Sequence, residues 1–131
     1  MASQIWPSIL TLGAMLVMIG NIVVVGHFRG RYNVVAPATT GHPQFERAYR
    51  VQMNTIENVL LFLPALWLAG MWGHVSTVQI GGAVWILARI LYAFAYIKDP
   101  AKRSLGYGLS CFAAAALMVD AAGGIVRSMP A

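Results

Sequence analysis

The chain has 131 residues, of which 59% are hydrophobic and 10% are charged. A soluble domain of this length could not bury so many apolar side chains, because a small domain keeps a large share of its surface in water. The composition therefore excludes the ordinary soluble classes and predicts one membrane domain over residues 1–131. The net charge of +5 gathers at the ends of apolar segments, which favours lipid head groups and anionic ligands over nucleic acid as partners.

Four apolar segments are each long enough to cross a hydrocarbon core about 30 Å thick. They span about 5–27, 44–72, 75–97 and 100–126, and they predict an all-α integral membrane protein, a bundle of four transmembrane helices. The first segment lacks the basic start of a signal peptide, since Arg29 and Arg31 follow it, so we expect it to be a helix of the mature protein. Asp99 before Pro100 predicts an N-cap with proline at the first position of the fourth helix.

The Lys and Arg residues predict the orientation of the bundle. The first and third links between the predicted helices are basic, whereas the second link, residues 70–76, has no Lys or Arg. Because basic links stay on the cytosolic side of a membrane, we expect the first and third links to face the cytosol. The basic residues at these two links are Arg29, Arg31, Arg47, Lys98, Lys102 and Arg103. A short multi-pass chain with no evident retention tail favours a bacterial inner membrane over the endoplasmic reticulum.

Polar residues line one face of the predicted second helix. Arg47, Arg50, Asn54 and Glu57 follow one another at steps of three, four and three residues, a spacing that places them along one helical face. An ionisable side chain inside a membrane costs about 2.5–3.5 kcal/mol on insertion scales, so a cluster of them requires a reason. One reason is internal pairing, in which Glu57 neutralises Arg50 or Arg89. The cations outnumber this carboxylate, and the excess favours a site for an anionic ligand.

The predicted third helix carries a second polar face near the same end. Arg89, Tyr92 and Tyr96 are spaced by three and four residues, and Arg103 follows in the first turn of the fourth helix. Tyrosines at this depth can also form an interfacial aromatic belt, but their alignment with Arg89 favours a ligand site. The positive end of the helix dipole adds to the charge of Arg103. Together these groups are suited to stabilise a thiolate or a carboxylate.

The segment FERAYRVQMNTIE, residues 45–57, resembles the signature of the MAPEG family, the membrane-associated proteins of eicosanoid and glutathione metabolism. The preceding TTGHP, residues 39–43, the segment RILY, residues 89–92, and the later Tyr96 and Arg103 extend the resemblance. It is closest to the leukotriene-conjugating and microsomal glutathione transferase branches. The resemblance covers nearly the whole chain and is weakest in the first and fourth helices.

The resemblance implies a homotrimer that binds glutathione between neighbouring subunits, near the cytosolic face. Residues of one subunit would hold the tripeptide, and two residues of the adjoining subunit would reach it. The first set comprises Arg50, Asn54, Glu57, Asn58, Arg89, Tyr92 and Tyr96, and the second Arg29 and Gln52. Asn58 stands where several relatives have a tyrosine, so a hydrogen bond or a stacking surface is expected to be missing there. Gln52 projects about half a turn away from the face of Arg50 and Glu57, which is compatible with an oligomer.

The residue matching Arg103 is the one that the family uses to stabilise the glutathione thiolate. A thiol with a pKa of about 8.5 is mostly protonated at neutral pH, and an adjacent cation favours the nucleophilic thiolate. The predicted function is therefore a membrane-bound glutathione transferase, with peroxidase activity possible for the same thiolate. The second substrate would be a lipophilic electrophile from the lipid phase. Two alternatives stay open, a non-catalytic membrane protein that binds and presents lipid and a glutathione-dependent isomerase.

The other polar residues have ordinary structural interpretations. His27, His42 and His74 are scattered over the two ends of the predicted bundle, so no metal site is expected. We expect Asp120 to pair with Arg127, seven residues later. Asn21 next to Gly20 predicts a polar contact between closely packed helices. The single cysteine, Cys111, is expected to fill space in the core.

Overall fold

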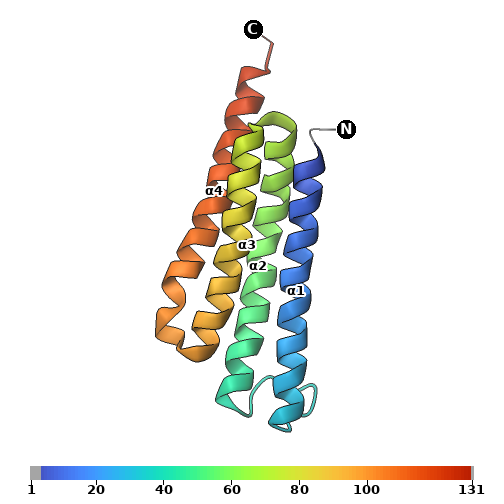
Figure 1. Ribbon diagram of the computed structural model, residues 1–131, viewed down its shortest axis with the longest axis vertical. Helices are drawn as coiled ribbons and strands as arrows, with labels where there is room; N and C mark the ends of the chain where they lie inside the picture. Colours follow the sequence, from blue (N-terminus) through green and yellow to red (C-terminus); the bar gives the residue numbers. More distant parts are fainter. Residues whose placement is uncertain (1–3, 131) are drawn as a thin grey trace.

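The computed structural model describes residues 4–130 and consists of four long helices that run alternately up and down (Figure 1). The helices are α1 (Ile5–Arg31), α2 (Pro43–Trp72), α3 (Val75–Lys98) and α4 (Ser104–Arg127), and the short 3-10 helix η2 (Pro100–Arg103) precedes α4. The four predicted helices are confirmed, and no strand occurs in residues 4–130. α1 continues through residues 28–31, past the end of the apolar segment, because helical hydrogen bonding does not require apolar side chains.

Two caps determine where the chain re-enters the bundle. The predicted N-cap at Asp99 is confirmed, since its Oδ1 accepts a hydrogen bond from the backbone N–H of Ala101 at 3.1 Å. This cap begins η2, and α4 continues from η2. His42 caps α2 in the same way, because its Nδ1 accepts from the backbone N–H of Gln44 at 3.2 Å. Both helices begin at the same end of the bundle, and their caps fix the positions of the polar residues in their first turns.

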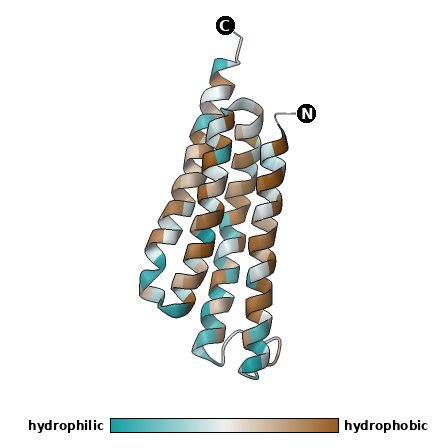
Figure 2. Ribbon diagram, in the orientation of Figure 1, coloured by the Kyte–Doolittle hydropathy of each residue, from teal (hydrophilic) through white to brown (hydrophobic). Residues whose placement is uncertain are grey.

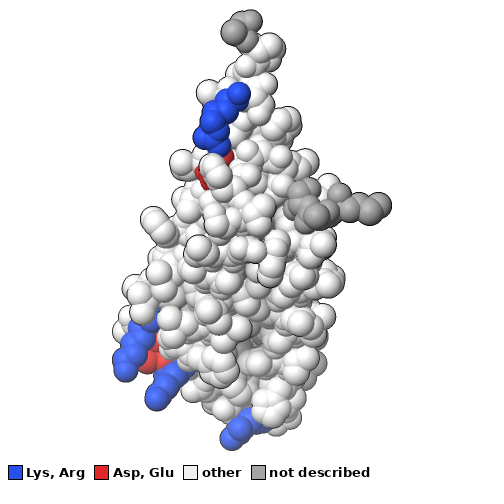
Figure 3. Space-filling view, turned by 45° about the horizontal axis from the view of Figure 1, so that its top comes forward, with Lys and Arg blue, Asp and Glu red and all other residues white. Residues whose placement is uncertain are grey.

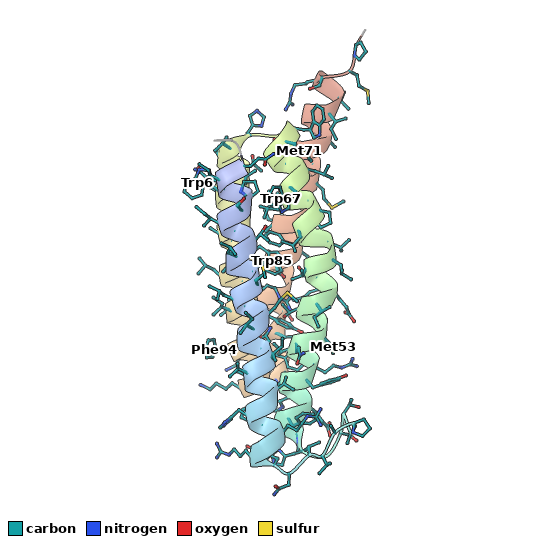
Figure 4. All side chains as sticks on the ribbon, turned by 90° about the vertical axis from the view of Figure 1, so that its right-hand side faces the viewer. Trp6, Met53, Trp67, Met71, Trp85 and Phe94 are labelled. Atoms are coloured by element: carbon teal, nitrogen blue, oxygen red, sulfur yellow. The ribbon has the colours of Figure 1, made fainter. Side chains whose placement is uncertain are left out.

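The helices form a bundle in which hydrophobic residues are frequent along most of the length of each helix (Figure 2). α2 and α3 each contact the other three long helices. Each of the four helical spans is long and apolar enough to cross a membrane. Large side chains such as Leu16 and Phe94 are 68% and 75% exposed, and Phe94 points away from the bundle (Figure 4). Such a surface is unfavourable in water but suits the acyl chains of a bilayer.

Stacked aromatic rings occupy the centre of the core. The rings of Phe62 on α2 and Trp85 on α3 are fully buried and lie 4.0 Å apart at an interplanar angle of 5°. Trp85 lies between the helices about midway along the bundle (Figure 4). Its indole N–H donates a hydrogen bond of 2.6 Å to Oδ1 of Asn58. A buried indole N–H needs such a partner, so Asn58 and Trp85 join α2 to α3 in the core.

α3 and α4 approach each other closely at Gly106. A Cβ at this position would lie 2.7 Å from the backbone nitrogen of Tyr92 and 2.8 Å from the carbonyl oxygen of Ala88. Both of these atoms belong to the backbone of α3, so they cannot move aside as a flexible side chain could. The glycine therefore permits the approach that places the start of α4 beside Tyr92.

The two ends of the bundle differ in charge. Most Lys and Arg side chains gather at one end of the molecule, and one basic patch lies near the other end (Figure 3). We call the first the basic end; it holds the α1–α2 link, the α3–α4 link and η2. The opposite end holds the α2–α3 link. There Asp120 accepts hydrogen bonds from the backbone N–H of His74 at 2.7 Å and pairs with its Nδ1 at 2.6 Å. The predicted pairing of Asp120 with Arg127 is wrong, because the α2–α3 link brings His74 to this carboxylate.

The prediction of a polar contact at Asn21, beside close helix packing at Gly20, is wrong, because Nδ2 of Asn21 is buried with no hydrogen-bond partner among the described residues. Asn21 is buried, with 8% of its surface exposed. A Cβ at Gly20, however, would have no other side chain or helix within 4 Å, so this glycine does not mark a close approach of two helices. Cys111 fills space as expected, and its Sγ lies 3.5 Å from Nδ2 of Asn58.

Candidate functional site

A polar cavity of about 190 Å³ opens at the basic end, between α2, α3 and η2. Its lining comes from three helices that are separate in the sequence. α2 contributes Arg50, Met53, Asn54 and Glu57, α3 contributes Tyr92 and Tyr96, and η2 contributes Arg103. Of the ten predicted catalytic and glutathione-binding residues, the structure therefore brings six together in one subunit. The cavity holds both signs of charge, aromatic rings and a side-chain amide.

The charged side chains that line this cavity do not form ion pairs with one another. Among residues 4–130 the only ion pair with a separation within 4.0 Å is that of His74 and Asp120, at the opposite end. Arg50 and Glu57 are both exposed on the cavity side of α2. Within residues 4–130, Glu57 therefore forms no ion pair with Arg50 or Arg89. Arg50, Glu57 and Arg103 remain available to a ligand that carries both an acid and an amine.

Arg47 has a different role from its neighbours on the same face of α2. Its Nη1 donates hydrogen bonds to the carbonyl oxygens of Ile97 and Lys98, at 3.2 and 3.4 Å. These carbonyls lie at the C-terminal end of α3, where backbone acceptors have no helical partner and a cation is favoured. Arg47 thus connects α2 to the end of α3 and holds the wall that carries Tyr96.

Arg89 lies beneath the cavity and has no exposed surface. Its Nη2 donates to Oγ1 of Thr55 at 2.7 Å and to Oδ1 of Asn54 at 3.4 Å, and its Nη1 lies 3.4 Å from Oγ of Ser110. Its guanidinium also lies 4.1 Å from the centroid of the Tyr92 ring, a cation–π contact. Arg89 was predicted to bind the ligand, but the structure places it behind Asn54 and Tyr92, where it positions them.

Arg103 stands at the rim, in the last residue of η2. Its Nη1 donates to the carbonyl oxygen of Pro100 at 3.1 Å, and its guanidinium carbon lies 5.8 Å from the centroid of the Tyr96 ring. The side chain is exposed, and most of its donors are free within the described residues. A cation held over an open cavity by one backbone carbonyl can bind an anionic atom of a ligand.

Three predicted ligand residues lie outside this cavity. Arg29 donates to the carbonyl oxygens of Val34 and Ala38, at 3.1 and 2.9 Å, and so ties the α1–α2 link together. Gln52 faces α1 and lines a small gap beside Asn21. Asn58 is buried in the core with Trp85. Within one subunit, none of these three side chains lines the cavity of Arg50 and Arg103.

The family model for the MAPEG family matches residues 7–123 of the chain. The chain belongs to the MAPEG family. It is 41% identical over 117 residues to an uncharacterized protein of Synechocystis sp., covering 89% of this chain and 85% of that protein. It is 38% identical over 104 residues to microsomal glutathione S-transferase 2 of Homo sapiens, covering 79% and 71%. It is 36% identical over 96 residues to leukotriene C4 synthase of Bos taurus, covering 73% and 63%.

The family assignment made from the sequence motifs is thus confirmed, and with it an integral membrane protein of four helices.

The site of this MAPEG protein also contains residues that were not predicted. Met53 lies on α2 toward the basic end (Figure 4) and lines the cavity. Ser104 and Tyr107 line an adjoining cavity of about 290 Å³, together with Asn54, Tyr92 and Arg103. The spacing of Tyr107, four residues after Arg103, places both on one helical face and could have revealed it.

Proposed function

We propose that this MAPEG protein is a glutathione transferase, which binds glutathione in the cavity between Arg50 and Arg103 and activates its thiol. The observation that carries the proposal is the convergence of Arg50, Glu57 and Arg103 on one cavity without an ion pair between them. Glutathione carries two carboxylates, one ammonium group and one thiol. A site with two free cations and one free carboxylate complements that charge pattern.

Each lining group has a role suited to its chemistry. Arg50 binds a carboxylate, and Glu57 binds the ammonium group, because opposite charges attract strongly in a site partly shielded from water. Asn54 and the tyrosine hydroxyls bind the peptide amides. Arg89 contacts no ligand and holds Asn54 and Tyr92 in place from below. Binding is therefore assigned to the residues that line the cavity, and positioning to Arg89 beneath them.

Arg103 is the catalytic residue of the proposal. With the tripeptide held by Arg50 and Glu57, the thiol lies near Arg103, whose charge favours the thiolate over the thiol. The thiolate attacks an electrophilic carbon, a carbon–sulfur bond forms, and the leaving group or the substrate oxygen takes the electron pair. With a hydroperoxide, the same thiolate attacks the terminal oxygen, a sulfur–oxygen bond forms as the O–O bond breaks, and the alkoxide takes a proton from water and leaves as an alcohol. A second glutathione then converts the resulting sulfenic acid to the disulfide, with loss of water. The lipophilic substrate enters from the bilayer, along the apolar outer surface.

The proposal includes a homotrimer in which glutathione lies between subunits. Two features support it, the open side of the cavity and the placement of Arg29 and Gln52 on a different side of the subunit. In a symmetric ring, a surface of one subunit meets a different surface of the next. Arg29 and Gln52 of the adjoining subunit would then close the site. The basic end would face the cytosol, because basic links stay on that side, and a bacterial inner membrane is the proposed location.

Two other functions use the same cavity. A membrane protein that presents lipid without catalysis needs only an anion clamp at Arg50, and the free guanidinium of Arg103 beside the tyrosines favours the enzyme over it. An isomerase that uses glutathione catalytically needs the same residues as the transferase. It differs in the outcome, because the isomerase regenerates glutathione whereas the transferase consumes it.

The test is conjugation of glutathione to a chlorinated nitroarene by the detergent-purified protein, with Arg103→Ala and Arg50→Ala compared with the wild type. We expect the wild type to turn over, Arg103→Ala to lose rate while it still binds glutathione, and Arg50→Ala to lose binding. Arg127→Ala, at the opposite end of the bundle, is the matched control and should leave both unchanged. Failure of the wild type to bind glutathione would refute the transferase and leave the lipid-presenting function.

A further inference from the structure

The cavity of about 290 Å³ lined by Ser104 and Tyr107 shares a wall with the glutathione cavity. The residues common to both are Asn54, Tyr92 and Arg103. We propose that this second cavity receives the reacting end of an α,β-unsaturated carbonyl compound with an apolar tail, and that the Tyr107 hydroxyl stabilises the oxygen anion formed during its conjugation. The inference rests on the proposed transferase function and names its substrate class and a further catalytic residue.

The shared wall determines where the reaction takes place. A thiolate bound at Arg103 lies on the boundary of the two cavities, because Arg103 lines both. The lining of the glutathione cavity includes Arg50 and Glu57, whose charges match the tripeptide, whereas the second cavity has neither residue in its lining. An uncharged electrophile therefore fits the second cavity, with its carbon facing the sulfur.

Tyr107 is placed to act on that electrophile. It follows Arg103 by four residues, so the two side chains lie on one face at the start of α4. The Tyr107 ring lies 6.3 Å from that of Tyr92, and 45% of the side chain is exposed. Within residues 4–130 its hydroxyl makes no hydrogen bond, whereas the nearby Ser110 hydroxyl is bound to the carbonyl oxygen of Tyr107. The Tyr107 hydroxyl is thus a free donor beside the sulfur position.

Exposed apolar side chains lie farther along α2 and α4, toward the middle of the bundle. Leu61 lies two turns beyond Asn54 on the same face of α2, and Met118 lies three turns beyond Tyr107 on the same face of α4. Both are well exposed, at 62% and 53%. Two turns correspond to about 11 Å, so an acyl tail can reach such side chains while the carbonyl end stays at Tyr107.

The chemistry requires a donor at the position of Tyr107. The thiolate adds to the β-carbon of the unsaturated carbonyl, a carbon–sulfur bond forms, and the C=C electron pair moves toward oxygen to give an enolate. The Tyr107 O–H donates a hydrogen bond to this enolate oxygen, where the charge develops. The α-carbon then takes a proton from water, and the thioether forms with no group lost. A reaction that expels chloride develops no oxygen anion and needs no such donor.

The experiment compares Tyr107→Phe with the wild type on two substrates, a long-chain 2-enal and benzyl chloride. We expect kcat/KM for the enal to fall by about 100-fold, as when one oxyanion donor is removed, and that for benzyl chloride to change less than 2-fold. Tyr49→Phe, whose ring packs against Phe45 away from both cavities, is the control and should change neither. A chain-length series of 2-enals should show KM falling as the tail lengthens.

The outcomes separate the two proposals. An equal loss on both substrates would assign Tyr107 to packing or glutathione binding, and no loss on either would remove it from the reaction; each result overturns the inference and leaves the transferase intact. If the wild type conjugates benzyl chloride but no enal, the substrate class is wrong. If it binds glutathione and conjugates neither, the proposed function fails and the inference fails with it.

Discussion

The guanidinium of Arg89 lies 4.1 Å from the centroid of the Tyr92 ring, and neither residue has more than 2% of its surface exposed. The same guanidinium donates to Thr55 and Asn54. A buried cation is costly unless its donors are satisfied. Nε of Arg89 has no hydrogen-bond partner among the described residues, whereas Nη2 reaches Asn54, which lines the site. Arg89 therefore sets the positions of Asn54 and Tyr92. A substitution of Arg89 should alter ligand binding in the cavity, although Arg89 does not line it.

Replacing Arg89 with methionine should weaken glutathione binding by about 10-fold, or about 1.4 kcal/mol, because Asn54 and Tyr92 lose their common support. Titration calorimetry in detergent measures the affinity, and thermal unfolding reports whether the variant is folded. Arg89→Lys keeps the charge but cannot make the same forked contacts, and it should show an intermediate loss. Unchanged affinity in both folded variants would contradict a positioning role for Arg89.

Asn58 is expected to contribute to stability and not to ligand binding. Asn58→Leu leaves the buried indole N–H of Trp85 without its partner at 2.6 Å, which should cost about 1–3 kcal/mol of unfolding free energy. Glutathione affinity should stay within 2-fold of the wild type. Adding Trp85→Phe to the same variant removes the unpaired donor and should recover part of the loss. A variant that keeps its stability but loses glutathione affinity would return Asn58 to the ligand site.

Gly106 and Gly108 offer a matched pair on α4. Alanine at Gly106 would press its Cβ against the α3 backbone, at 2.7 Å from the nitrogen of Tyr92, whereas a Cβ at Gly108 meets nothing within 4 Å. Gly106→Ala should lower the unfolding temperature and the conjugation rate together, because α4 carries Tyr107 and directly follows Arg103. Gly108→Ala should preserve both, since alanine is the better helix former. Equal effects of the two changes would show that the close approach at Gly106 is unimportant.

The helices were predictable because each signal is local. Runs of about 20 apolar residues give the four spans, and Asp99 before Pro100 gives the cap that begins η2. The face of Arg50, Asn54 and Glu57 follows from helical spacing alone. Contacts between helices were not predictable in the same way. The partner of Asp120 is His74, 46 residues away, and no periodicity in either helix encodes that contact.

The depth of a residue within the bundle was the main quantity that the sequence did not determine. Arg89 and Tyr92 share a helical face, yet Arg89 is directed beneath the cavity whereas Tyr92 lines it. Asn58 is adjacent to Glu57 in the chain, but the 100° turn between them directs Asn58 into the core. Tyr107 was missed because a tyrosine near a membrane interface resembles an aromatic belt. The structure places it in the lining of the cavity beside Arg103.

The central claim is that Arg103 stabilises the thiolate of bound glutathione. The most direct measurement is a pH titration of the ultraviolet thiolate absorption of glutathione bound to the wild type and to Arg103→Ala, each at saturating ligand. In the wild type the thiol pKa should lie at least one unit below the ordinary value of about 8.5, and in Arg103→Ala it should return close to that value. A thiol pKa that is equally low in both proteins would contradict the role assigned to Arg103.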